Sequence, residues 1–219
     1  MRALRSLARP AAAAALAAAC LLPALRPAAT QGAGAPLPFA VGEEMVFRAR
    51  SSRWGTVGTG SMRVEPAETV RGASAWKLHF HFGGRVGPAR VEDCTASWLV
   101  PERMASLRYH HYERAPLSRR TEEVEMFPAE RRWTGRNGQG GRSATDAPLD
   151  ELSFLYYVRT LRLEPGAEYT LNRHFDPNRN PVHVRVLRRE RQTVPAGTFS
   201  VVVVEMRVRD PRVGDQGGG

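Results

Sequence analysis

The sequence PLDELSFLYYVRTL (residues 148–161) decides the fold, because it carries the one convincing helical pattern beyond the N-terminal segment. Apolar residues recur in and just after it at near-helical spacing, at Leu149, Leu152, Tyr156 and Leu163. Asp146 is expected to cap the helix, with Pro148 in its first turn. The segments on both sides read as strands. The sequence therefore predicts a mainly β fold in which a curved antiparallel sheet, a half-open barrel, wraps around one α-helix.

Ten segments have strand-like patterns and are separated by turn residues. The expected strands span residues 45–50, 57–64, 76–82, 89–100, 104–112, 118–127, 131–134, 169–175, 182–187 and 199–208. Residues 135–147, GRNGQGGRSATDA, are expected to form a polar loop. Residues 118–127 offer little apolar surface, so this strand is expected near an exposed edge, where its charges discourage further pairing.

The clearest alternation lies in residues 76–82. One face carries Trp76, Leu78, Phe80 and Phe82, and the other carries Lys77, His79 and His81. Gly83 and Gly84 are expected to end this strand. In the preceding strand Gly58 and Gly60 share a face, which predicts that another backbone or an aromatic ring lies close over it.

The last expected strand, residues 199–208, is apolar on both faces. Val201 and Val203 fall on one side, and Val202, Val204, Met206 and Val208 fall on the other. Such a strand is expected in the middle of a covered sheet. Because a glycine-rich ending follows it at once, one flank of the sheet lacks its expected neighbour, and the sequence predicts a C-terminally truncated chain.

The N-terminus has the pattern of a secretion signal. Arg2, Arg5 and Arg9 precede an alanine- and leucine-rich segment, residues 11–22, that is too short to span a bilayer comfortably. The expected organisation is a signal peptide (1–29), a tether (30–38), a single β-rich domain (39–209) and a flexible tail (210–219). The mature chain is expected to have no transmembrane span and to be exported.

The position of signal cleavage stays open between two readings. LAAAC (residues 16–20) resembles a bacterial lipobox shifted by one residue, which would acylate Cys20 and anchor a periplasmic protein to the outer membrane. Ordinary cleavage near Ala29, or within residues 33–36, is the alternative. If the leader is lost beyond Cys20, only Cys94 remains, and a small buried thiol is expected there.

The net charge of +10 includes four leader arginines, so the mature chain carries about +6. Interspersed acidic residues indicate a solvated face rather than a binding patch. Export, and the lack of a basic stripe interleaved with aromatic residues, argue against nucleic acid as a partner.

Five short segments occur in the order seen in the domain-of-unknown-function-3108 family of exported bacterial proteins. They are FAVGEE (39–44), VGTG (57–60), LSFLYYVR (152–159), LEPG (163–166) and VPAGTF (194–199). The chain resembles this family over residues 39–209. The family pattern continues into at least two more strands, which strengthens the expectation of truncation. The resemblance implies a fold similar to the periplasmic lipoprotein carriers, an analogy of fold and not of function.

The sequence lacks G-x-S-x-G, H-E-x-x-H, C-x-x-C and the P-loop motif, so no catalytic residue, metal site or cofactor is expected. A metal site built from His79, His81, His110 and His111 is conceivable, but His79 and His81 lie opposite the apolar face. The adjacent His110 and His111 must point to opposite sides of their strand. His174-Phe175-Asp176 offers a base and an acid without a nucleophile.

The leading interpretation is a non-catalytic envelope protein that binds or carries an apolar or lipid-like ligand, with a lipid or lipoprotein as partner. It predicts a cavity of several hundred Å³, open at one edge. The expected ligand-lining residues are Trp54, Phe154, Tyr156 and Tyr157.

The alternative is a structural or interaction protein with a filled core and an envelope protein as partner. A third hypothesis is an enzyme in which two of Asp93, His110, His111, His174 and Asp176 meet across a pocket.

Overall fold

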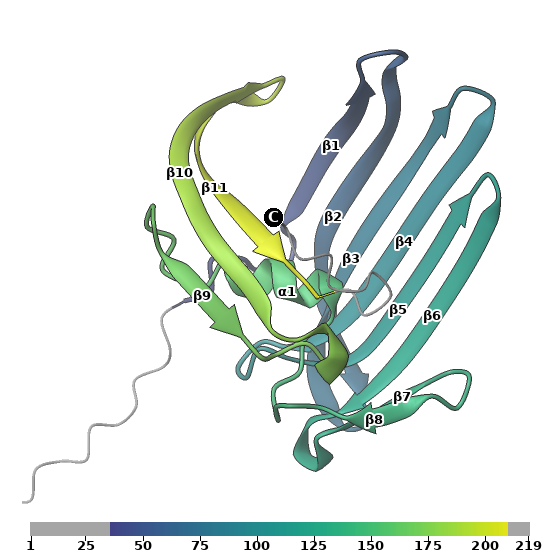
Figure 1. Cartoon of the computed structure of the whole chain (residues 1–219), viewed down its shortest axis with the longest axis vertical. Coiled ribbons are helices and arrows are strands. Elements are labelled where there is room, and N and C mark those ends of the chain that lie inside the picture. Colours follow the sequence, from purple (N-terminus) through teal and green to yellow (C-terminus); the bar gives the residue numbers. More distant parts are fainter. Residues whose placement is uncertain (1–35, 210–219) are drawn as a thin grey trace, which may run out of the picture. The chain divides into compact units, whose positions relative to one another are not determined.

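The computed structural model describes residues 36–209, so the predicted signal peptide, Cys20, most of the tether and the tail lie outside the described residues. Eight strands form one open antiparallel sheet in which each strand pairs with the next along the chain. They are β1 (Glu44–Ser51), β2 (Gly55–Val70), β3 (Ala73–Val86), β4 (Ala89–Val100), β5 (Ala105–Ala115), β6 (Ser118–Phe127), β7 (Arg132–Gly135) and β8 (Gly140–Arg142). Figure 1 shows β1 to β6 side by side as the long strands of this sheet.

A second antiparallel sheet has three strands, β9 (Glu168–Leu171), β10 (Val182–Val194) and β11 (Gly197–Arg207), in the order β11-β10-β9. The prediction that the valine-rich strand lies in the middle of a covered sheet is wrong, because β11 pairs only with β10 among the described strands. Residues 201–206 of β11 are half-buried, whereas residues 197–200 are exposed and Phe199 is 50% exposed. Alternation cannot distinguish a covered central strand from an edge strand with two apolar faces.

The helix α1 (Glu151–Val158) is shorter than predicted and begins four residues later than Asp146 implies. Its N-cap is Asp150, whose carboxylate accepts hydrogen bonds from the backbone N–H groups of Leu152 and Ser153. Leu149 precedes the helix in an isolated parallel β-bridge with His174, a contact with a distant segment that local spacing does not reveal.

The main core joins α1 to both sheets (Figure 1). Phe154 and Tyr156 from the helix, Leu78 from β3 and Val184 from β10 are each at most 2% exposed in one cluster. The predicted fold class, a curved antiparallel sheet around one helix, is confirmed. Within residues 36–209 no helix is long and apolar enough to cross a membrane.

Several predicted boundaries are corrected by the pairing. β3 continues through Gly83 and Gly84 to Val86, because β2 and β4 continue to pair with it there. The predicted loop 135–147 contains β8, which pairs with β7. Two 3-10 turns, η1 (Pro128–Glu130) and η2 (Pro177–Arg179), complete the elements. The edge prediction for residues 118–127 agrees with the pairing, since β7 pairs only with Val124–Phe127 and leaves the first half of β6 unpaired on that side.

Candidate functional site

The face of the large sheet that meets α1 is built from three cross-strand rows, which the register fixes. The first row is buried and consists of Val64, Leu78, Ser97, Tyr109 and Val124. The second consists of Met45, Met62, Phe80, Thr95, His111 and Glu122. The third consists of Phe47, Gly60, Phe82, Asp93, Glu113 and Arg120. Apart from Gly60 and Thr95, which are buried, the residues of the second and third rows are half-buried or exposed.

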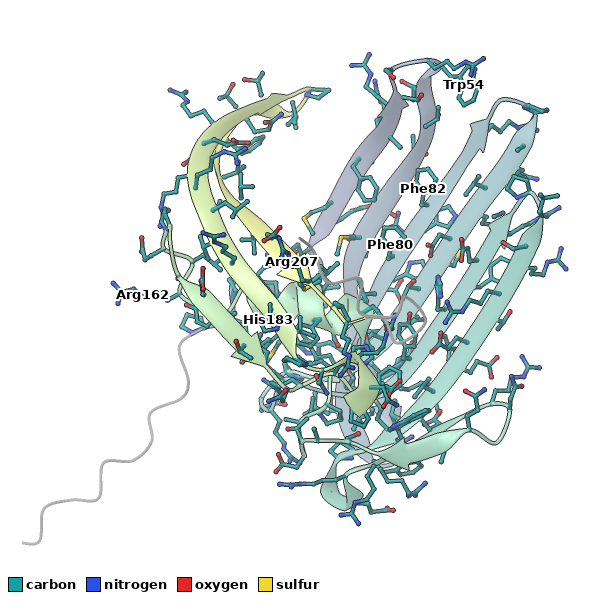
Figure 2. All side chains as sticks on the ribbon, in the orientation of Figure 1. Trp54, Phe80, Phe82, Arg162, His183 and Arg207 are labelled. Carbon is teal, nitrogen blue, oxygen red and sulfur yellow. The ribbon has the colours of Figure 1, made fainter. Side chains whose placement is uncertain are left out.

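The apolar half of these two rows is an aromatic strip, defined as Met45, Phe47, Met62, Phe80 and Phe82, on β1 to β3. Met45 and Phe47 are 39% and 38% exposed, and the other three members are half-buried. The rings of Phe47 and Phe80 stack with centroids 6.0 Å apart. Figure 2 shows Phe80 and Phe82 following one another along β3. The strip continues the main core outward, since Met62 and Phe80 also pack against the core cluster.

Glycines form the floor of the strip, as the sequence predicts for Gly58 and Gly60. A Cβ at Gly60 would lie 2.4 Å from the Phe47 ring, and a Cβ at Gly58 would lie 2.7 Å from Cζ of Phe82. Both distances are far shorter than van der Waals contact, so each ring lies directly on a backbone without a side chain. The prediction that another backbone or a ring lies close over these glycines is confirmed, with a ring at both positions.

The other half of the same two rows, on β4 to β6, is polar. His111 Nε2 lies 3.3 Å from a carboxylate oxygen of Asp93, and Arg120 pairs with Glu122 at 2.6 Å. His110 points to the opposite side of β5 and packs its ring edge-on against Trp98, as the sequence predicts for adjacent histidines. The uncovered face is therefore amphipathic, with an aromatic side and a hydrogen-bonding side.

The better-formed hollows in the described part of the chain have volumes of about 220 to 470 Å³, and the aromatic strip lines none of these. The cavity expected for a carrier is thus not found at the strip, which is an open sheet face. Asp93 lines none of these hollows, whereas His111 lines one of them.

The predicted ligand-lining residues fall in two environments. Phe154 and Tyr156 are 2% and 1% exposed and lie in the main core. Tyr157 is half-buried, with the guanidinium of Arg173 4.3 Å from its ring centroid. Trp54 is 49% exposed in the turn between β1 and β2, beyond the end of the aromatic strip (Figure 2). Their contact with a ligand stays a prediction.

The sequence analysis did not identify Phe47 and Met62 as members of the candidate site, although alternation within residues 45–50 and 57–64 places both on the apolar faces of their strands.

Tyr156 allows one test of this placement. Its hydroxyl is buried and has no hydrogen-bond partner among the residues that the structure describes, and burial raises the pKa of Tyr156 to about 12. Because Tyr156→Phe removes an unsatisfied polar group, we expect the free energy of unfolding to stay constant or rise by up to about 1 kcal/mol in urea denaturation.

Tyr169→Phe is the control. It loses a hydrogen bond of 2.6 Å to the Arg162 carbonyl and should be destabilised by about 0.5–1 kcal/mol. A loss of more than 1 kcal/mol in Tyr156→Phe would contradict the placement.

The four histidines considered as metal ligands do not bring three ligand atoms together. Among the described residues, the only close set of three ligand atoms joins His81, Glu92 and Cys94. The sequence gives no sign of it, because it depends on which residues of β3 and β4 lie opposite one another.

No curated protein and no solved structure significantly matches this chain. A family model described as a protein of unknown function (DUF3108) matches residues 45–218, which include α1 and every strand described here except the first residue of β1. The chain therefore belongs to the DUF3108 family of proteins of unknown function.

Proposed function

We propose that this chain is an exported, non-catalytic protein of the cell envelope that binds the apolar part of a lipid-like ligand on the aromatic strip. The observation that carries the proposal is the half-exposed row of aromatic and methionine side chains beyond the helix. Leaving such a surface in water is unfavourable by about 25 cal/mol for each Å² of apolar area, so a ligand that covers it is stabilised by that burial. The leader-like N-terminus supports export.

The second half of the face supports an amphipathic ligand over a purely apolar one. An alkyl chain on the strip would place the polar end of the molecule beside Asp93 and His111, where hydrogen-bonding groups are already half-buried. Methionine side chains adapt their shape to irregular apolar partners, which suits a flexible alkyl chain.

The test is native mass spectrometry of the protein purified from a bacterial envelope, followed by organic extraction of bound molecules. We expect a stoichiometric lipid. Titration of the delipidated protein with parinaric acid, a fluorescent fatty acid, then measures binding directly. Phe47→Glu places a carboxylate on the strip and should weaken binding at least tenfold, because the apolar chain would have to desolvate the charge.

Val46→Glu is the matched control. Val46 is the neighbouring residue on β1, 72% exposed, and alternation places it on the opposite face. Its variant should bind like the parent protein. If the parent protein carries no lipid and takes up none, or if both variants weaken binding equally, the aromatic strip is not the binding surface.

One observation favours the alternative, an interaction protein. β11 is an edge strand among the described strands and is apolar on both faces, so its free backbone groups could pair with a strand of an envelope protein. A clean apo mass that stays unchanged when lipids are offered would favour this alternative.

A further inference from the structure

A second candidate site lies on the opposite face of the large sheet from the aromatic strip. His81 of β3 lies directly across from Cys94 of β4, and Glu92 lies two residues before Cys94 on the same side of the strand. One ligand atom from each of the three side chains lies within 4.8 Å of the other two. All three side chains are half-buried.

Gly83 lies beside this cluster on β3. It lies directly across from Glu92, two residues after His81 and on the same face. A Cβ placed on Gly83 would lie 3.4 Å from Cε1 and 3.8 Å from Nε2 of His81, so the imidazole ring lies over the glycine. The ring therefore leans along β3 toward Glu92 while its backbone stays opposite Cys94.

The three donors are an imidazole nitrogen, a carboxylate oxygen and a thiol sulfur, a set that suits Zn²⁺. Zinc–ligand bonds of about 2.0–2.3 Å require ligand atoms roughly 3.5 Å apart in a tetrahedral site. The ligand atoms lie within 4.8 Å of one another, so they would have to move about 1 Å closer together to bind the ion. Rotation of the half-buried side chains can supply this movement. Three protein ligands leave a fourth position for water or another molecule.

The surroundings allow an ion to enter. His81, Gly83 and Glu92 line a hollow of about 470 Å³, which also holds Arg85 and Arg90. Burial, together with the nearby carboxylates of Glu92 and Asp93, raises the pKa of the Cys94 thiol. Binding of Zn²⁺ displaces the thiol proton, and the resulting thiolate and the carboxylate together balance the charge of the ion beside the two arginines.

We propose that His81, Glu92 and Cys94 form a binding site for one Zn²⁺ ion. The site is independent of the lipid-binding function proposed above, since it lies on the other face of the sheet. Its open fourth position makes it a site for exchangeable or ligand-coordinating zinc rather than a closed structural site.

The test uses the full chain with Cys20→Ser, so that Cys94 is its only thiol. Calorimetric titration of the metal-free protein with ZnCl₂ should show one ion per chain. Titration with Co²⁺ should produce the near-ultraviolet charge-transfer absorption of a cobalt–thiolate bond. Cys94→Ala should abolish this absorption, and both Cys94→Ala and His81→Gln should weaken zinc binding at least tenfold.

His79→Gln is the matched control. His79 lies on the same strand and the same face as His81, but its Nδ1 lies 3.9 Å from a carboxylate oxygen of Glu65, outside the cluster. This variant should keep the parent affinity. A further measurement does not depend on whether the variants fold, because it uses the chain that retains all three ligands. In that chain Zn²⁺ should slow the alkylation of Cys94 by iodoacetamide at least tenfold. Absence of zinc binding, or binding without protection of Cys94, overturns the proposal.

Discussion

Replacing Asp150 by alanine is expected to lower the free energy of unfolding by about 3 kcal/mol. Loss of an N-cap costs about 1 kcal/mol, and leaving buried polar partners unsatisfied costs about 1–3 kcal/mol more. The Asp150 side chain is fully buried and accepts hydrogen bonds from two backbone N–H groups of α1. It also accepts a hydrogen bond of 2.6 Å from Ser97 of β4, so it joins the helix to the sheet.

The control for this prediction is Asp146→Ala. The sequence favours Asp146 as the cap, yet its side chain is 59% exposed and its closest ionic contact, with Arg103, is 3.9 Å long. This variant should change the free energy of unfolding by less than about 0.5 kcal/mol. Urea denaturation followed by circular dichroism measures both variants. If Asp146→Ala costs as much as Asp150→Ala, the helix does not begin where the structure places it.

Replacing Phe154 by alanine is expected to cost about 3–5 kcal/mol of stability, because the change removes a buried ring and leaves a cavity. Phe154 is 2% exposed, and its ring meets that of Tyr157 edge-on with centroids 6.1 Å apart. Its neighbour Leu155 is 43% exposed, so Leu155→Ala should cost less than about 1 kcal/mol.

Helix propensity contributes at most a few tenths of a kcal/mol to the difference between the two variants, since both place alanine in the same short helix. Denaturant unfolding gives the stabilities. A small loss for Phe154→Ala would mean that the ring lines a space able to collapse or to hold a ligand, as the sequence predicted, rather than filling the core.

The sequence was sufficient for the fold class because alternation fixes which side of a strand is apolar. Residues 76–82 illustrate this: Leu78 is fully buried on the predicted face, and His79 is half-buried on the other. The start of the helix was missed because Asp146 with Pro148 is an attractive local signal. The capping box of Asp150 with Ser153 was also readable, but the decisive hydrogen bond to Ser97 comes from a strand 53 residues away.

The candidate sites were less predictable because they depend on register. A shift of one residue between two strands would exchange all the side chains of one face. In the large sheet the pairing of neighbouring strands shifts between Ala49 and Arg50, between Glu65 and Ala67, and between Trp98 and Leu99. No local pattern reveals their positions. The approach of His111 to Asp93 and of His81 to Cys94 therefore appears only in the folded sheet.

The rings that lie on Gly58 and Gly60 also have a spectroscopic consequence. The α-protons of these glycines fall within the magnetic shielding of the Phe82 and Phe47 rings, because each ring lies where a methyl group would otherwise be. Their proton resonances should be displaced strongly upfield from the random-coil position. A molecule that lifts or rotates either ring would change that displacement without touching the glycine itself, so two backbone signals report on the occupancy of the whole strip.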